Sequence, residues 1–425
     1  MLNFQISATD ERITPQAGLA LVGEVYANLG LGDLLDRHLP PPGSATGYQP
    51  SDFVLPLVLM QIGGGEALDH TRQLTADACL LKLFGLSQLP DPGTTGDWLR
   101  RTYARGYEGL RNVITTLNRA VLAADARTDY TFDPDATGIE SDKSSAKMTY
   151  KGFTGYMPML GILAEVPVVL VDDFREGNVS PQVGILETIR QACAAMPNGK
   201  RIAYMRSDSA GYQAAVINEC LQEKIIFGIT ADLDVAVREA IATIQQWHQC
   251  VDKNGQPTDR EWGVVAHTMN KMKEGFLLIV QRWEDPKRPV DLFGKHYCYH
   301  AIATNHPGKG PAVIAWHNQR ANSENYNKEI KLGFGLEHLP CNDFGANAMY
   351  FRIGILAYNL MVAMKWLVLP SDWRKSTIKT LRWLFIHTAG KLIRHGRRWI
   401  LKLAGLSAEA WWNWRNIRLR CLQLC

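Results

Sequence analysis

A change of pattern at residue 127 constrains the fold more than any other feature of this sequence. A β-prone run covers residues 128–132, and residues 157–174 are rich in Ile, Leu and Val around a turn at Glu165-Val166-Pro167, so three successive strands are predicted. Helical spacing over residues 180–196, a strand at 202–205, a helix at about 212–222 and a strand at 225–229 follow. This order, β-β-β-α-β-α-β, indicates an α/β core.

The segments on either side of this core have different patterns. Residues 1–125 read as short helices separated by Pro and Gly clusters, which predicts an all-helical N-terminal domain. Within it, a turn at residues 91–95 precedes a helix from near Asp97, which Thr94 or Thr95 could cap. Residues 232–307 are predicted to form a strand-rich insertion, and a helix begins near Ala312. The core therefore comprises residues 126–231 and 308–370.

The most apolar stretch of the chain, residues 353–370, is interrupted by Asn359 and Lys365. It falls short of the ~20 clean apolar residues that a membrane span needs, which favours a buried helix. The N-terminal residues show no basic stretch followed by an apolar run, so no secretory signal is expected. The eight cysteines include no Cys-x-x-Cys pair, which favours reduced thiols and a cytoplasmic location.

Positive charge is concentrated at the C-terminal end, residues 371–425. This basic region contains twelve Lys and Arg against two Asp and Glu, a net charge of +10 in a chain of +4. It also contains Trp373, Trp383, Trp399, Trp411, Trp412 and Trp414. Cations interleaved with aromatic rings can grip phosphates and stack on bases, whereas buried tryptophans under solvated charges give the same composition. The sequence leaves both interpretations open.

Three acids lie where a site is expected in an α/β sheet, at strand ends or on a helix beside them. Asp135 follows the first predicted strand, Asp208 follows the fourth, and Glu324 lies on the late helix. At ~100° per residue, one face of that helix carries a stripe of roughly 80°, comprising His317, Arg320, Glu324, Lys328 and Lys331. A carboxylate that holds Mg²⁺ beside cations that grip a phosphate suits a phosphodiester site; a solvated amphipathic helix is the alternative.

The same helix resembles the Y-x2-R-x3-E-x6-K signature of bacterial insertion-sequence DDE transposases. Arg320, Glu324 and Lys331 stand at the family spacing, and His317 stands where tyrosine is usual. Asp135, in an Asp-x-Thr match, resembles the family's first acid, and Asp208 resembles the second. The predicted strand order, with an insertion before the Glu324 helix, is similar to the ribonuclease-H-like core of the cut-and-paste members.

The resemblance implies a metal-dependent DNA phosphoryl-transfer enzyme with Asp135, Asp208 and Glu324 as catalytic carboxylates. These would hold two Mg²⁺ ions ~4 Å apart, with Mn²⁺ as a substitute, while His317, Arg320 and Lys331 would bind DNA phosphates. The implied partners are double-stranded DNA, as terminal inverted repeats and as target, and a second copy of the chain in a synaptic homodimer. The helical N-terminal domain would be the main part that binds the transposon ends, with the insertion and the basic C-terminal region helping. No membrane is implied, and the expected location is the bacterial cytoplasm, at the nucleoid.

Several alternatives remain open at this point. Asp133 competes with Asp135 as the first acid, because residues two apart on a strand share a face. His317 would donate a hydrogen bond to phosphate or simply lie on the helix surface. A tryptophan of the insertion would stack on an extruded base or belong to the core; the candidates are Trp247, Trp262 and Trp283.

Three other functions compete with transposition. A nuclease or resolvase would use the same metal site without strand transfer, and a DNA-binding protein derived from a transposase would lack catalysis. A glycosidase with paired carboxylates would leave the cations beside Glu324 unexplained.

Overall fold

The computed structural model describes residues 2–44, 46–252, 254–272, 274–285, 287, 296–404 and 407–415. The chain divides into two compact units. The helical unit comprises Met1–Asp125, Ile139–Tyr156 and Lys328–Cys425, and the sheet unit comprises Ala126–Gly138 and Met157–Asn327. Arg418 and Arg420 of the predicted basic region lie outside the described residues.

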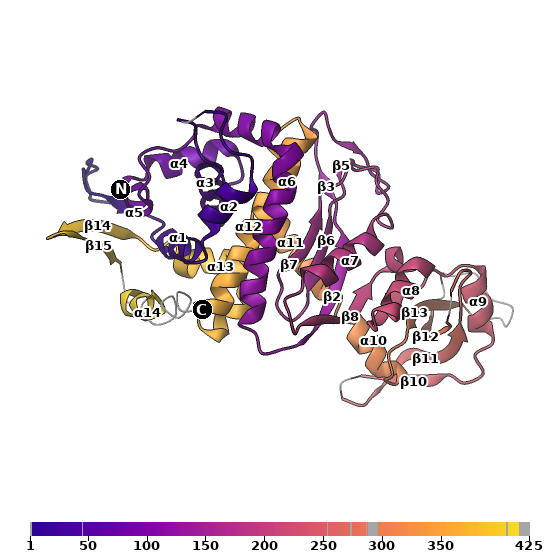
Figure 1. Ribbon diagram of the computed structural model, residues 1–425. Coiled ribbons are helices and arrows are strands. Elements are labelled where there is room, and N and C mark those ends of the chain that lie inside the picture. The colour runs from indigo at the N-terminus through magenta and orange to yellow at the C-terminus, as the bar shows by residue number, and fades with distance from the viewer. Residues whose placement is uncertain are drawn as a thin grey trace. The chain divides into compact units, whose positions relative to one another are not determined.

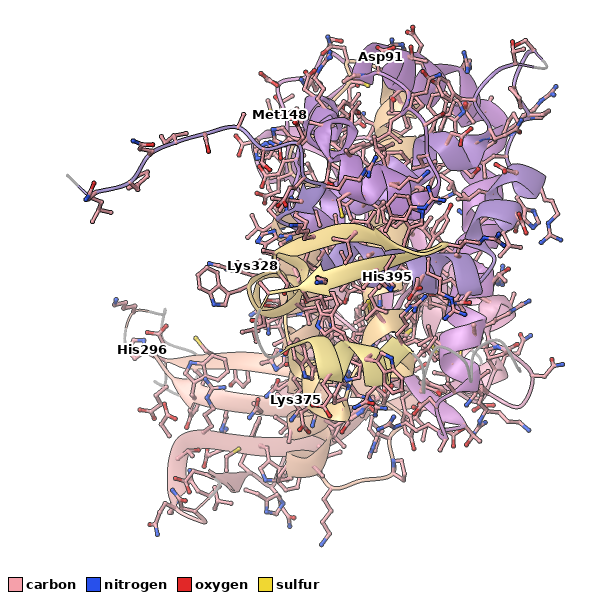
Figure 2. The ribbon with its side chains drawn as sticks, turned by 90° about the vertical axis from the view of Figure 1, so that its left-hand side faces the viewer. Asp91, Met148, His296, Lys328, Lys375 and His395 are labelled. Carbon is pink, nitrogen blue, oxygen red and sulfur yellow. The ribbon has the colours of Figure 1, made fainter. Side chains whose placement is uncertain are left out.

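The helical unit begins with a short strand and a series of helices. These are β1 (Ile13–Thr14), α1 (Gly18–Asn28), α2 (Leu31–His38), α3 (Pro50–Gly63), α4 (Thr71–Ala76), α5 (Ala78–Phe84) and α6 (Pro92–Ala123). Helix α6 begins five residues earlier than expected, and neither Thr94 nor Thr95 caps it. Its cap is Asp91, labelled in Figure 2, whose carboxylate accepts from the backbone N–H groups of Gly93 and Thr94. Pro92 then occupies the first helical position, which its fixed φ suits.

The centre of the helical unit is α12 (Phe344–Leu367), which lies alongside α6 (Figure 1). Almost every residue of α12 is buried, so the buried helix predicted for residues 353–370 is confirmed. Its polar Asn359 donates a 2.8 Å hydrogen bond to Asn118 of α6, which offsets part of the cost of burying these amides. No helix in the described parts of the chain is long and apolar enough to cross a membrane. The sequence places α12 in the core domain, whereas in the structure it belongs to the helical unit.

Short elements complete this unit. A small sheet contains β3 (Ile139–Glu140), β4 (Lys147–Met148) and β5 (Thr154–Tyr156), and the C-terminal part contains α13 (Ile378–Leu381), β14 (Gly390–His395), β15 (Arg398–Leu403) and α14 (Ser407–Asn413). β14 and β15 form an antiparallel hairpin that pairs with β1.

The sheet unit contains a nine-stranded mixed sheet in the order β10-β11-β12-β13-β9-β8-β2-β6-β7. The first strand, β2 (Asp129–Ala136), is flanked on one side by the antiparallel β6 (Met159–Leu163), which β7 (Val169–Asp173) follows. On its other side lie the parallel strands β8 (Arg201–Ser207) and β9 (Ile226–Thr230). Helices α7 (Ile185–Ala195) and α8 (Ala214–Gln222) connect these strands, so the predicted β-β-β-α-β-α-β order is confirmed.

The insertion continues this sheet instead of forming a separate one. Its helix α9 (Val235–Ala242) precedes β10 (His248–Val251), β11 (Pro257–His267), β12 (Phe276–Glu284) and β13 (Tyr297–Thr304). The last of these strands pairs with β9, with Ile302 opposite Thr230. Strand β9 would otherwise be an edge strand of the core, and its pairing with β13 leaves it inside the sheet, where it cannot pair with another chain.

The helix predicted from near Ala312 is two helices, α10 (Gly310–Asn318) and α11 (Ala321–Gly333), separated at Gln319 and Arg320. Val313 and Ile314 of α10 pack on Ile279 and Ile302 of the sheet, with Trp262 against this cluster. The stripe predicted from His317 to Lys331 is therefore wrong as one helix face, because His317 lies before the break. The division between the units falls within α11, at Lys328.

Candidate active site

Asp135 lies in β2 itself, one residue before the strand ends, and its side chain is 16% exposed. Asn327 of α11 donates a 2.8 Å hydrogen bond from Nδ2 to one carboxylate oxygen, Oδ2. The other oxygen, Oδ1, lies 4.0 Å from an Arg320 guanidinium nitrogen. The carboxylate is thus held by two side chains of the α10–α11 segment.

Asp208 follows β8 directly and keeps an extended backbone, with φ −71° and ψ −170°. Its carboxylate accepts a 3.1 Å hydrogen bond from the backbone N–H of Ala210 and caps the short helix Ser209–Gly211. The parallel register sets Phe132 opposite Met205. This is the last parallel pair of the two strands, and Asp135 and Asp208 each lie three residues beyond it, toward the carboxyl ends of β2 and β8.

Glu324 lies in the first turn of α11, and its side chain is 62% exposed. Arg320 donates to its Oε1 across 3.4 Å while remaining near Asp135. One guanidinium therefore contacts the two carboxylates that come from β2 and from α11. The three predicted acids, Asp135, Asp208 and Glu324, all belong to the sheet unit.

The electrostatics of Asp135 connect these groups. Burial raises the pKa of Asp135 to about 6, and repulsion from the Asp208 and Glu324 carboxylates adds to this rise. The Arg320 charge and the Asn327 hydrogen bond act in the opposite direction. Asp135 is thus a buried acid among like charges, which an added cation would relieve.

The oxygen atoms near Asp135 suit a hard divalent cation. They include carboxylate oxygens from three segments and the buried Oδ1 of Asn327, which has no hydrogen-bond partner. Within the described residues no three His, Cys, Asp or Glu side chains gather at metal-ligand spacing. In this arrangement Asp135, Asp208 and Glu324 therefore do not converge on one metal position, and the Glu324 side chain is paired with Arg320 instead.

Asn327 is absent from the residues singled out by the sequence. It lies three residues after Glu324, a spacing at which helical side chains are neighbours, and that spacing is the signal that could have identified it.

Asp133, the competing first acid, has a different role. It accepts two hydrogen bonds from Arg206 of β8, and the two side chains are only 3% and 2% exposed. Burial raises the pKa of Asp133, while the Arg206 hydrogen bonds and charge oppose that rise. A carboxylate occupied in this way contributes to the structure beneath the site.

His317 does not reach the surface that a phosphate would approach. It is 3% exposed, with Nδ1 3.1 Å from the Gly228 carbonyl oxygen and Nε2 3.0 Å from the Thr230 hydroxyl. Burial lowers the pKa of His317 to about 3, so the ring is neutral. The structure contradicts both alternatives, phosphate donor and helix-surface residue. Helix α10 ends one residue after His317, and the imidazole ring packs against the sheet.

The remaining candidates lie elsewhere. Lys331 is in the last turn of α11, in the part of that helix that belongs to the helical unit. The tryptophans of the insertion are each partly buried, and two of them stack with cations: Arg282 lies 3.9 Å from the centre of the Trp247 ring, and Arg260 lies 4.7 Å from that of Trp283. Base stacking by these rings remains a prediction.

Comparisons with known proteins bear on the whole chain. Residues 2–416 match the family described as Transposase DDE domain group 1. No curated protein matches the chain. Among solved structures, the chain is similar to one described as the cryo-EM structure of piggyBac transposase synaptic complex with hairpin DNA. The sequences are 11% identical, the TM-score is 0.48, and the match covers 89% of this chain and 82% of that one.

Proposed function

Because this chain belongs to the family described as Transposase DDE domain group 1, we propose that it cleaves DNA at transposon ends and joins those ends to target DNA. The catalytic residues are Asp135, Asp208 and Glu324. The observation that supports this assignment is the raised pKa of Asp135, which burial and the Asp208 and Glu324 charges produce together. Strongly perturbed acids of this kind cluster at functional sites.

The sheet order supports a ribonuclease-H-like core. The first strand is central, the second and third are antiparallel on one side, and the fourth and fifth are parallel on the other. This arrangement has Asp135 on β2 and Asp208 directly after β8, the strand beside it.

The three carboxylates would hold two Mg²⁺ ions, with Mn²⁺ as a substitute. When bound, the metal ions activate the attacking water or 3′-hydroxyl and stabilise the leaving oxygen. Asn327 orients Asp135 through its 2.8 Å hydrogen bond. Arg320 offsets part of the negative charge of Asp135 and Glu324 before DNA arrives, and its guanidinium has the shape to bind a phosphate through two hydrogen bonds. Lys331 is a second phosphate contact in this proposal.

The substrate in this proposal is double-stranded DNA, as inverted repeats and as target, with a homodimer pairing two ends. A nuclease or resolvase with the same residues would make the first cut and stop at hydrolysis. A non-catalytic DNA-binding protein would make no cut at all. The products therefore separate the three functions.

The test uses purified full-length protein, DNA that carries the inverted repeats flanking its gene, a target plasmid and Mg²⁺. We expect cleaved ends and joined products from the wild type and neither from Asp208→Asn. Asparagine preserves the cap on Ala210, so the variant keeps the local fold. Asp129→Asn is the matched control, since this exposed Asp lies on β2 and pairs with Arg201. Normal cleavage by Asp208→Asn would refute the proposed site.

A further inference from the structure

The hairpin β14–β15 of the helical unit is unusual in its charge (Figure 2, where His395 at the end of β14 is labelled). Residues 390–404 contain five Lys and Arg, one His and no Asp or Glu. The five cations are Lys391, Arg394, Arg397, Arg398 and Lys402. We name this segment the basic hairpin.

Most of these charges face solvent without an acid beside them. Lys391 pairs with Glu11. The other four cations are exposed and have no acidic partner within the described residues. Two exposed arginines elsewhere in the same unit do have one: Arg72 pairs with Asp69 at 3.1 Å, and Arg100 pairs with Asp97. The unpaired cations of the basic hairpin thus form a concentrated positive field that an anionic partner would satisfy.

The pairing register divides the hairpin into two faces. Leu392 lies opposite Leu401, and Leu392 is buried, so this face packs on the unit. The other face carries Lys391 opposite Lys402 and His395 opposite Arg398, with Ile400 41% exposed between them. Lys391 and Lys402 therefore occupy one end of the outer face, and Arg398 occupies the other end, opposite His395.

Trp399 adds a flat aromatic surface near the turn. It is 37% exposed, and three cations surround its ring: Arg12 at 5.3 Å, Lys82 at 5.5 Å and Arg394 at 5.8 Å from the ring centre. These cations extend the positive surface from the hairpin onto the residue before β1 and onto α5. The basic composition of residues 371–425 is thus gathered partly on one structural element.

We propose that the basic hairpin binds the phosphate backbone of duplex DNA, an inference that rests on the proposed function in taking DNA as the substrate. A two-stranded β-ribbon has the width to enter the major groove. Its unpaired cations then replace the counterions of the phosphates, which supplies affinity without reading sequence. The hairpin acts as a second DNA contact, separate from the carboxylate site.

A second copy of the chain is the competing occupant, because β15 is the last strand of its sheet, in the order β1-β14-β15. Two β15 strands paired around a twofold axis would bring Arg398 and Lys402 close to the same cations of the other copy. Like charges directly opposite each other destabilise a strand pair. Charged residues on an edge strand are a common protection against such pairing.

The test removes three exposed cations in the variant R397Q/R398Q/K402Q. Binding to duplex DNA is measured by fluorescence anisotropy over a series of salt concentrations. Each lost phosphate contact reduces the slope of log affinity against log salt by about 0.9, so we expect a reduction of about 2.7. The control R72Q/R100Q/R190Q removes the same charge from exposed arginines that already pair with acids, including Arg190 with Glu219. Its slope should match that of the wild type.

Three further measurements keep the outcomes distinct. Circular dichroism and Tm should be unchanged, since the replaced side chains are exposed. Single-turnover cleavage by the control R72Q/R100Q/R190Q should stay within about twofold of the wild type, because these arginines lie in neither the carboxylate site nor the basic hairpin. If the wild type cleaves DNA but the slope of log affinity against log salt is the same in R397Q/R398Q/K402Q, the hairpin proposal is wrong and the proposed function stands. A reduced slope with a wild type that never cleaves would support the hairpin and refute the proposed function. Loss of a dimer at unaltered slope would assign the hairpin to self-association and overturn the proposal.

Discussion

Arg206 donates to both carboxylate oxygens of Asp133, at 2.9 and 2.7 Å, and the two side chains are buried. The same guanidinium donates to the carbonyl oxygen of Trp316 at 3.0 Å. Asp133 precedes Asp135 by two residues, and Arg206 precedes Asp208 by two. Trp316 lies near the end of α10, just before the segment that carries Glu324. One ion pair thus ties together the three segments that carry the candidate acids.

This pair gives the first prediction, on stability. Arg206→Met leaves the Asp133 carboxylate buried and unpaired, so the free energy of unfolding should fall by about 3–5 kcal/mol. Urea denaturation measures the change. Arg201→Gln is the matched control, because Arg201 and Asp129 join the same two strands at 2.8 Å but are 61% and 45% exposed. Loss of an exposed pair should cost less than about 1 kcal/mol. Equal losses in the two variants would contradict the role of the buried pair.

The second prediction concerns the free-energy cost of keeping the buried Asp135 carboxylate ionised. Its pKa is about 6 in the folded protein, against about 3.9 in an unfolded chain. A raised acid pKa means that folding stability is lost as pH rises from about 4 to 6. Without divalent metal at pH 7, Asp135→Asn should therefore raise the free energy of unfolding by about 3 kcal/mol, while keeping an oxygen to accept from Asn327.

The pH dependence identifies the cause of this gain. The difference between Asp135→Asn and the wild type should be constant above pH 6 and disappear near pH 4. Asp129→Asn, on the same strand but exposed, should show no such gain. If Asp135→Asn is less stable than the wild type at pH 7, the ionised Asp135 carboxylate does not destabilise the folded protein and the prediction is wrong.

The third prediction is that Mn²⁺ binding depends on the ionisation of Asp135. Metal ions bind the deprotonated carboxylate. Because burial and neighbouring carboxylates raise the pKa of Asp135 to about 6, affinity should fall about tenfold for each pH unit below 6 and level off above it. Calorimetric titration at pH 5, 6 and 7 measures this. EDTA should abolish DNA cleavage without unfolding the protein. Equal Mn²⁺ affinity at pH 5 and pH 7 would mean that Asp135 is not a metal ligand.

Local sequence patterns were sufficient for the order of the core. Residues 157–174 are rich in Ile, Leu and Val and are divided by a turn, and the short run 202–205 follows a Pro-Asn-Gly turn, so the order of the strands could be read from them. That order also placed Asp208 after the fourth strand. By contrast, pairing between β13 and β9 joins residues more than seventy positions apart, such as Ile302 and Thr230. No local pattern specifies which edge an inserted strand will join.

The break between α10 and α11 has a tertiary cause that the sequence does not display. Residues 316–320 contain neither Pro nor Gly. The Trp316 carbonyl accepts from Gln319 N at 3.2 Å and from Arg206 at 3.0 Å, so the next turn of α-helix does not form there. Counting ~100° per residue placed His317 and Glu324 on one face because it assumes one continuous helix. The Arg206–Trp316 contact shows why that assumption failed.

The last prediction concerns His317, whose neutral ring lies between Gly228 and Thr230. Burial lowers the pKa of His317 to about 3, against about 6.5 in an unfolded chain. The unfolded chain therefore binds a proton below pH 6.5 that the folded protein does not, and stability falls by about 1.4 kcal/mol per pH unit. At pH 7, His317→Ala should cost about 2 kcal/mol, because two buried polar groups lose their partner.

This cost should shrink as pH falls from 7 to 5, since only the wild type carries the proton penalty. Urea denaturation at both pH values measures the change. The slope of DNA affinity against salt should stay that of the wild type, because the ring contacts no phosphate from its buried position. A slope reduced by about 0.9 in His317→Ala would instead mean that His317 makes one phosphate contact in the wild type. That result would restore the role expected from the sequence, and it would require the α10–α11 junction to open when DNA binds.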